Sequence, residues 1–243
     1  MIDSLHDTHF HLDLYDNVSN IVKEIEKRKS YTVAVTNLPI LYDKLNNRIN
    51  SKYVRVALGF HPELILEYSK YIPLMWSLLE ESRYIGEVGL DLKNKSVSDR
   101  NAQTAFFKEL ISRCNNLGGK ILSIHSRYSE KEVLSFTDNF NGTIIYHWFS
   151  GSLTNLDKAI SSDGFFSINY AMLNSIKGKK IIDMIPNDRI LLESDGPFVK
   201  INRKLFQPND LSIILEKLAY HKSLHLTEMR KIISQNFKNI LLR

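Results

Sequence analysis

The sequence predicts an α/β protein, and within that class a (β/α)8 TIM barrel with a C-terminal extra helix. Short apolar, β-branched runs alternate with stretches of helical period, which indicates a parallel sheet with crossover helices. Eight such runs occur within 243 residues, close to the length of one α/β barrel. No Gly-rich phosphate loop follows the first run, so an open doubly wound sheet is less favoured.

The expected strands share apolar and β-branched residues and are the segment ending at His9, Tyr31–Thr36, Tyr53–Leu58, Tyr84–Val88, Lys120–Ile124, Thr143–Tyr146, Phe165–Ile168 and Ile190–Leu192. Helices are expected between them at Asn17–Lys29, Pro39–Ile49, Pro62–Ser82, Arg100–Leu117, Tyr128–Asn139, Leu153–Ser162 and Asn174–Ile185. Of two further helices, Asp210–His221 would close the barrel and Thr227–Leu242 would pack beneath or beside it. No linker rich in Pro, Gly or Ser divides the chain, which predicts a single domain over residues 1–243.

Composition and charge limit the class of partner. A formal charge of +5 favours an anionic partner such as nucleic acid. Cys114 is the only cysteine, so an intrachain disulfide is excluded and a reducing compartment is expected. The N-terminus lacks the basic and apolar stretches of a secretory signal, and no segment has the roughly 20 apolar residues of a membrane span. We therefore expect a cytoplasmic protein with no membrane partner.

A His-x-His pair, His9 and His11, begins the candidate metal site. Strand side chains alternate between faces, so both imidazoles point to the same side. Further potential ligands occur near the ends of later strands: Glu87, His125, His147 and Asp195. The carboxyl ends of all barrel strands converge on one face, so these side chains should meet there. Four imidazoles and two carboxylates exceed the needs of one tetrahedral ion and suit two ions bridged by a carboxylate.

Six motifs surround these residues: Asp7–Asp13 (DTHFHLD), Gly59–Pro62 (GFHP), Ile85–Asp91 (IGEVGLD), Ile124–Arg127 (IHSR), Tyr146–Gly151 (YHWFSG) and Leu192–Pro197 (LESDGP). In this order they resemble the TatD-type metal-dependent deoxyribonucleases of the amidohydrolase superfamily. By that resemblance one metal would be held by His9, His11, Glu87 and Asp195. The other would be held by Glu87, His125 and His147, with Glu87 as the bridge.

The same resemblance implies a reaction. A hydroxide activated by two divalent metal ions would attack phosphorus, and the catalytic residues would be Asp195, as the base, and Glu87. The expected substrate is DNA, degraded from single-stranded ends in the 3′ to 5′ direction. Mixed nitrogen and oxygen ligands suit Zn²⁺ or Mn²⁺, whereas the resemblance implies Mg²⁺ or Mn²⁺, so the ion stays open among Mg, Mn and Zn.

Substrate contacts are expected from cations and flat rings around the metal site, because phosphates need positive partners and unpaired bases need stacking surfaces. By motif position, His61 and Arg127 would contact phosphate. Lys200, Arg203 and Lys204, in the loop after the last strand, would add positive charge. Trp148, Phe149 and Phe198 are the expected stacking rings.

The region after Asp195 departs from the family pattern. Its segment Lys200–Pro208 lacks the glutamate of the usual Arg-Asn-Glu-Pro motif, and Gly196 and Phe198 stand where Ala or Thr and Tyr are more usual. These changes bear on substrate choice more than on metal binding and predict a divergent branch. One such branch, which this Asn- and Lys-rich chain resembles, is the TatD-like component of the bacterial Qat anti-phage defence cassette, whose other proteins would be partners.

Two other functions stay open. A metal-dependent deacylase or amidohydrolase would use the same centre on another substrate, such as aminoacyl-tRNA. A non-catalytic binding subunit of a defence complex would keep the barrel without turnover.

Overall fold

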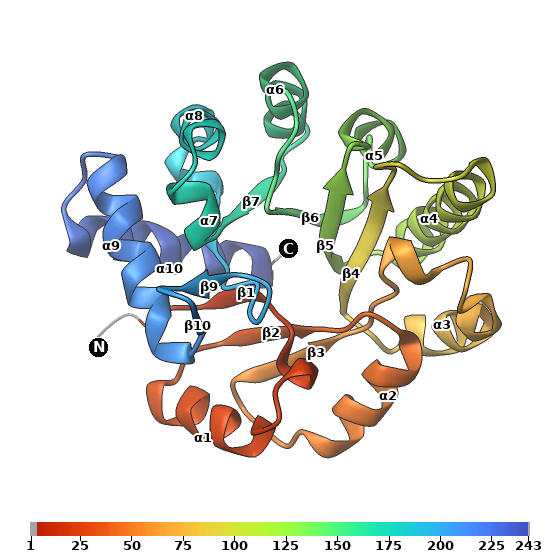
Figure 1. The fold of residues 1–243 in the computed structure, drawn as a ribbon, viewed down its shortest axis with the longest axis horizontal. Coiled ribbons are helices and arrows are strands. Elements are labelled where there is room, and N and C mark those ends of the chain that lie inside the picture. The colour runs from red at the N-terminus through yellow and green to blue at the C-terminus, as the bar shows by residue number, and fades with distance from the viewer. Residues whose placement is uncertain (1–3, 243) are drawn as a thin grey trace.

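The computed structural model describes residues 4–242, and its centre is a barrel of parallel strands (Figure 1). The strands are β1 (Asp7–Phe10), β2 (Thr32–Val35), β3 (Val54–Ala57), β4 (Tyr84–Asp91), β5 (Lys120–Arg127), β6 (Gly142–His147), β7 (Phe165–Ile168) and β8 (Ile190–Leu192). Strands β1 to β3 pair in order, and strands β4 to β8 pair in order, all in parallel. The predicted fold class is confirmed.

Backbone hydrogen bonds join these two sets of strands into a ring. Between β3 and β4, Leu58 forms a parallel bridge with Ile85. Between β8 and β1, the Asp195 amide donates to the His9 carbonyl (3.0 Å), and the Thr8 hydroxyl donates to the Leu192 carbonyl (3.0 Å). The carboxyl ends of all eight strands therefore face the same side of the barrel.

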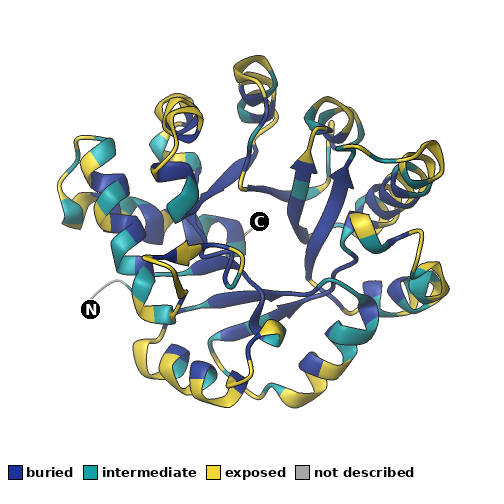
Figure 2. Cartoon of the chain, in the orientation of Figure 1, coloured by how far each residue is buried: buried dark blue, intermediate teal, exposed yellow. Residues whose placement is uncertain are grey.

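Helices surround the strands (Figure 1) and are α1 (Val18–Arg28), α2 (Pro39–Arg48), α3 (Ile72–Leu79), α4 (Val97–Leu117), α5 (Glu130–Phe136), α6 (Leu153–Ser161), α7 (Tyr170–Leu173), α8 (Ile176–Met184), α9 (Leu211–His221) and α10 (Leu226–Leu242). Figure 2 shows their exposed residues on the outer side and the strands almost wholly buried. Among residues 4–242, no helix is long and apolar enough to cross a membrane.

The last helix covers the amino-terminal end of the barrel. Phe237 and Ile240 of α10 share a cluster with apolar residues at the starts of the strands, such as Tyr84 and Ile121. The Asn236 side chain donates to the carbonyls of Asn187 (2.7 Å) and Ile190 (2.8 Å), which fixes α10 against β8. The extra helix closes this end, so the open end is the one that carries the candidate ligands.

Two element predictions need correction. The stretch Pro62–Ser82 forms two short 3-10 turns before α3, because Pro73 lacks an amide hydrogen and is tolerated only in a first turn. The helix predicted at Asn174–Ile185 is confirmed as α8, which the Ser175 hydroxyl caps by accepting from the Gly178 amide (2.9 Å). The loop after β8 contains an antiparallel hairpin, β9 (Lys200–Ile201) with β10 (Lys204–Leu205).

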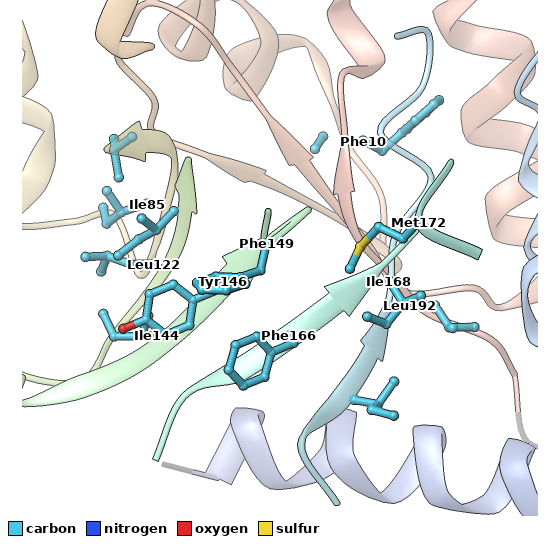
Figure 3. Close-up of a cluster of buried hydrophobic side chains, with 14 of the residues drawn as sticks. Phe10, Ile85, Leu122, Ile144, Tyr146, Phe149, Phe166, Ile168, Met172 and Leu192 are labelled. Carbon is cyan, nitrogen blue, oxygen red and sulfur yellow. The ribbon is translucent and has the colours of Figure 1, made fainter. Parts of the chain in front are cut away.

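The main core lies between the barrel and its helices (Figure 3). Within it, the ring of Tyr146 lies 5.9 Å from that of Phe149 and 5.5 Å from that of Phe166, measured between centroids. Phe149 is 1% exposed. The expectation that Phe149 stacks on a base is therefore wrong, because its ring is packed in the core against Tyr146 and Phe166.

Candidate metal centre

Glu87, in β4, lies at the middle of the ligand cluster and presents its two oxygens to different imidazoles. Its Oε2 lies 3.4 Å from His11 Nε2 and 3.7 Å from His9 Nε2. Its Oε1 lies 2.7 Å from His125 Nδ1, 3.3 Å from His147 Nε2 and 3.6 Å from His61 Nε2. The carboxylate is almost wholly buried, so two distinct sets of donors meet on one side chain.

The first set also includes Asp195. Its Oδ1 lies 3.6 Å from His11 Nε2 and 3.8 Å from His9 Nε2, and these two nitrogens are 3.2 Å apart. Ligands bound tetrahedrally at about 2.1 Å from one ion would be roughly 3.4 Å from each other. The observed separations bracket this spacing, and the nitrogen and oxygen donors are those that divalent metals accept. This set therefore fits a metal ion.

The second set of donors surrounds Oε1 of Glu87 and comprises His125, His147 and His61. Its spacing is less regular than that of the first set, but it offers the same imidazole and carboxylate donors. Glu87 and His125 approach to hydrogen-bonding distance, and His61 lies beside them, with ring centroids of His61 and His125 4.9 Å apart. One atom from each of these three residues falls within 4.8 Å of the others. His61 was expected to contact phosphate, and its position makes it an additional candidate ligand.

Neighbouring side chains fix the orientation of the imidazoles. His9 Nδ1 lies 2.8 Å from the Ser123 hydroxyl. His147 Nδ1 lies 3.1 Å from Glu193 Oε2, and Glu193 also accepts from Asn169 Nδ2 (2.8 Å) and from the Ser167 hydroxyl. A carboxylate behind a ligating histidine holds the ring and leaves its other nitrogen free for a metal. Sequence reasoning missed Glu193, although it lies within the motif that contains Asp195.

Burial and mutual attraction shift the protonation of the cluster. Burial lowers the pKa of His9 to about 3 and raises that of Asp195 to about 7, the latter against attraction from His147 and His11. Burial alone would raise the pKa of Glu87, but the nearby imidazoles, His61 first, hold it well below its usual value. Carboxylate charge is thus concentrated on Glu87, between the two sets.

In the second set, burial lowers the pKa of His61 to about 4, whereas the pKa values of His125 and His147 are raised. Burial alone would lower the pKa of His125, but hydrogen bonds to Asp91 and Glu87 raise it to about 9. Against the same effect of burial, Glu193 and Glu87 raise the pKa of His147 well above its usual value. A cation that binds here must displace protons from these rings.

Sharp turns place several residues at the ends of the strands. Tyr128 follows β5 with φ 56°, Trp148 follows β6 with φ 39°, and Asp195 follows β8 with φ 48°. Residues other than glycine rarely adopt positive φ, and such positions often occur at functional sites. The positive φ at Trp148 ends β6 in a sharp turn, and Trp148 is 38% exposed whereas the next residue, Phe149, is buried.

Four of the candidate ligands, Glu87, His125, His147 and Asp195, line a pocket of about 930 Å³ at the carboxyl end of the barrel, and His9 and His11 lie behind them outside its lining. Of the predicted substrate contacts, those in its lining are His61, Arg127, Trp148 and Phe198. Lys200, Arg203 and Lys204 are exposed but do not line it, because the β9–β10 hairpin pairs with itself and carries them away. Their contact with a substrate stays a prediction, from a position outside the lining of this pocket. Two other lysines line it, Lys93 and Lys177, neither of which lies in a recognised motif.

A closed parallel barrel with imidazoles and carboxylates at the carboxyl ends of its strands is an architecture of metal-dependent hydrolases. Over residues 6–242 the sequence matches the family described as TatD related DNase, and the chain belongs to this family. The predicted enzyme class, a metal-dependent hydrolase of TatD type, is confirmed.

Relatives extend over almost the whole chain. An uncharacterized metal-dependent hydrolase of Methanocaldococcus jannaschii is 25% identical over 239 residues, 95% of this chain and 94% of that protein. The human deoxyribonuclease TATDN3 is 23% identical over 253 residues, 95% of this chain and 92% of the human protein. The crystal structure of the TatD homologue YJJV from Escherichia coli K12 has a TM-score of 0.86 and 19% identity over all of both chains, which shows the shared fold.

Proposed function

We propose that this protein is a metal-dependent deoxyribonuclease that hydrolyses phosphodiester bonds at single-stranded DNA ends, in the 3′ to 5′ direction. The observation that carries the proposal is the position of Glu87, whose two oxygens face separate groups of imidazoles at the carboxyl end of the barrel. A bridging carboxylate between two ions is the arrangement of many phosphodiester-cleaving enzymes. Deoxyribonucleases among the relatives support DNA as the substrate. The polarity follows from family resemblance and is tested below.

His9, His11 and Asp195, with Oε2 of Glu87, would hold one ion. His125 and His147, with Oε1 of Glu87, would hold the second, and His61 lies close enough to join them. Two divalent cations, Mg²⁺, Mn²⁺ or Zn²⁺, would lower the pKa of a bound water and stabilise charge on the attacking and leaving oxygens.

Asp195 is the proposed base. Its backbone is held on both sides, because its amide donates to His9 and its carbonyl accepts from the Val199 amide (3.0 Å). Its side chain lines the pocket and faces the His9 and His11 imidazoles. A carboxylate held in that place can orient the nucleophilic water and accept its proton.

The walls of the pocket suit a nucleotide. Arg127 is half exposed and lies 3.6 Å from Asp91, so its guanidinium is anchored while still open to a phosphate. Phe198 packs edge-on against His11, with ring centroids 4.9 Å apart, and Trp148 lies edge-on to His147 at 6.5 Å. These two rings flank the ligands on the side where a terminal base would lie.

The test uses a single-stranded DNA labelled at its 5′ end, incubated with Mg²⁺ or Mn²⁺. The expected result is a ladder that shortens one nucleotide at a time and is absent with Asp195→Asn. The matched control is Asp183→Asn, an aspartate exposed on α8 and paired with His221. Immediate release of the labelled nucleotide would show that the enzyme degrades DNA from the 5′ end instead. Absence of cleavage with both ions, together with release of amino acid from aminoacyl-tRNA, would favour the deacylase alternative.

We also propose a cytoplasmic location and, within a divergent branch, defence-cassette partners. The first is supported by a single cysteine that is buried and reduced, and the second by the altered segment after Asp195. Affinity purification from the native host tests both. If ligand-site variants that lose the metal keep full biological activity, the non-catalytic alternative is correct.

A further inference from the structure

We propose that Lys93, Arg127 and Tyr128 form an outer nucleotide subsite, in which a base stacks on the Tyr128 ring and its phosphate is held by the two cations. This inference rests on the proposed nuclease function and deepens it. The subsite lies at the ends of β4 and β5, beyond the ligands that line the pocket. It would hold a second nucleotide, next to the one that reacts.

Strand pairing brings the three residues together. Asp91 is the register partner of Arg127 in the β4–β5 ladder, and the Leu92 amide donates to the Arg127 carbonyl (3.0 Å). Lys93 and Tyr128 are therefore the residues that leave this ladder on either strand. The Lys93 ammonium lies 5.6 Å from the centroid of the Tyr128 ring.

Local hydrogen bonds fix the two turns that carry Lys93 and Tyr128. The hydroxyl of Ser129, which is buried, donates to the Leu90 carbonyl (2.7 Å) and ties the turn after β5 to β4. The Lys93 amide donates to Asp91 Oδ1 (3.2 Å). Tyr128 itself has φ 56°, a conformation that turns the chain sharply after the strand. A preorganised ring loses little freedom when a base stacks on it.

Exposure marks the ring as a binding surface. Among the described residues, four Phe, Trp or Tyr residues are at least 38% exposed, and three of them line this pocket, namely Tyr128, Trp148 and Phe198. Tyr128 is 68% exposed, so Lys93 leaves most of the ring open. Exposed aromatic surface beside cations is the combination that binds single-stranded nucleic acid.

The charges nearby are also arranged for a phosphate. Of the acidic residues in the wall, Glu63 is paired with Lys95 at 2.5 Å and Asp91 with Arg127 and His125, whereas Glu130 also lines the pocket and forms no ion pair among residues 4–242. Within the same residues no carboxylate lies within ion-pair distance of Lys93, so its charge is available to a ligand.

The test compares two probes by fluorescence in Mn²⁺. One is a phosphorothioate tetranucleotide with 2-aminopurine next to its 3′-terminal residue, and the other is 2-aminopurine deoxynucleoside monophosphate. In Tyr128→Ala we expect affinity for the tetranucleotide to fall about tenfold, while affinity for the monophosphate changes less than about twofold. Tyr128→Phe should restore tetranucleotide binding, because the ring remains. The matched control is Tyr220→Ala, which removes a tyrosine that is 89% exposed on α9.

The role of Lys93 is tested by the salt dependence of tetranucleotide binding. Lys93→Ala should weaken the tetranucleotide and reduce the slope of log affinity against log salt by about one contact, roughly 0.7. Lys238→Ala, on the far end of the barrel, should leave that slope unchanged. Equal losses for both probes in Tyr128→Ala, or tetranucleotide binding equal to the wild type, would overturn the subsite while leaving nuclease activity intact. Failure of the wild type to bind the tetranucleotide and to cleave DNA would overturn the proposed function as well.

Discussion

Replacing Glu193 by Gln tests whether the carboxylate behind His147 controls cation binding. Glu193 is fully buried and accepts hydrogen bonds from three groups, His147 Nδ1, Ser167 Oγ and Asn169 Nδ2. An amide has one accepting oxygen. If that oxygen faces Asn169, the NH2 group of the glutamine faces the His147 donor. In the flipped orientation the NH2 group faces the NH2 group of Asn169, because Asn169 Oδ1 already accepts from the Met172 amide (3.0 Å).

Either orientation leaves a buried donor facing a donor, which costs about 1–3 kcal/mol of unfolding free energy in the metal-free protein. In the first orientation His147 Nδ1 faces the amide NH2 group and keeps only its 3.2 Å contact at the Oε1 position, and in either orientation the ring loses the negative charge behind it, so Nε2 is held less firmly toward the pocket. Loss of such a partner typically weakens metal binding by about 10–100-fold, or roughly 1.4–2.7 kcal/mol.

Calorimetric titration of the metal-free protein with Mn²⁺ measures the change, and denaturant unfolding reports the stability. Ser167→Ala is the matched control, because it removes one donor to Glu193 but leaves the contact with His147, and we expect less than about a threefold effect on cation affinity. Wild-type affinity in a folded Glu193→Gln protein would refute the reasoning. Equal losses in both variants would also refute it, since the effect would then not pass through His147.

Three further predictions concern protons, packing and the thiol. The pKa of His125 is raised to about 9, so a cation that binds must displace the proton on this ring. Mn²⁺ affinity should therefore rise as pH approaches 9 and then level off. Titration in buffers of different ionisation enthalpy measures the released protons, and an affinity independent of pH would contradict this prediction. Gly59→Ala would place a Cβ 1.6 Å from the Thr36 carbonyl oxygen. We therefore expect the free energy of unfolding, measured with denaturant, to fall by at least about 2 kcal/mol, and a change below about 0.5 kcal/mol would refute the close contact. Burial raises the pKa of Cys114 to about 12, so the native thiol should stay unreactive toward a disulfide reagent near pH 8 until denaturant is added, and rapid native labelling would show that α4 opens.

The barrel could be predicted from local sequence patterns, and so could the set of candidate ligands. Strand and helix periods are local patterns, so the eight strands and their order could be read without a structure. The His9–His11 pair follows from the alternation of side chains along a strand. The convergence of the other candidate ligands was predicted because parallel strands share one carboxyl face, although β4 and β5 continue past Glu87 and His125, and only His147 ends its strand.

Only the tertiary structure decided how these side chains divide and what surrounds them. Which oxygen of Glu87 faces which imidazole depends on how the barrel closes. The contact between His147 and Glu193 depends on it too, because His147 ends β6 and Glu193 follows β8. Trp148 and Phe149 are adjacent aromatic residues in the sequence, and only the packing shows that Trp148 lines the pocket while Phe149 is buried in the core.

The substrate side of the pocket shows the same division. Lys200 and Arg203 looked favourable from their place after the last strand, yet a two-residue turn with φ 50° and 66° at Asn202 and Arg203 folds their segment into a hairpin outside the pocket wall. Lys93 and Tyr128 lie 35 positions apart in the sequence and meet only because the registers of β4 and β5 bring their ends together. Local patterns carry strand periodicity and residue chemistry, but distances between loops are set by how the barrel closes.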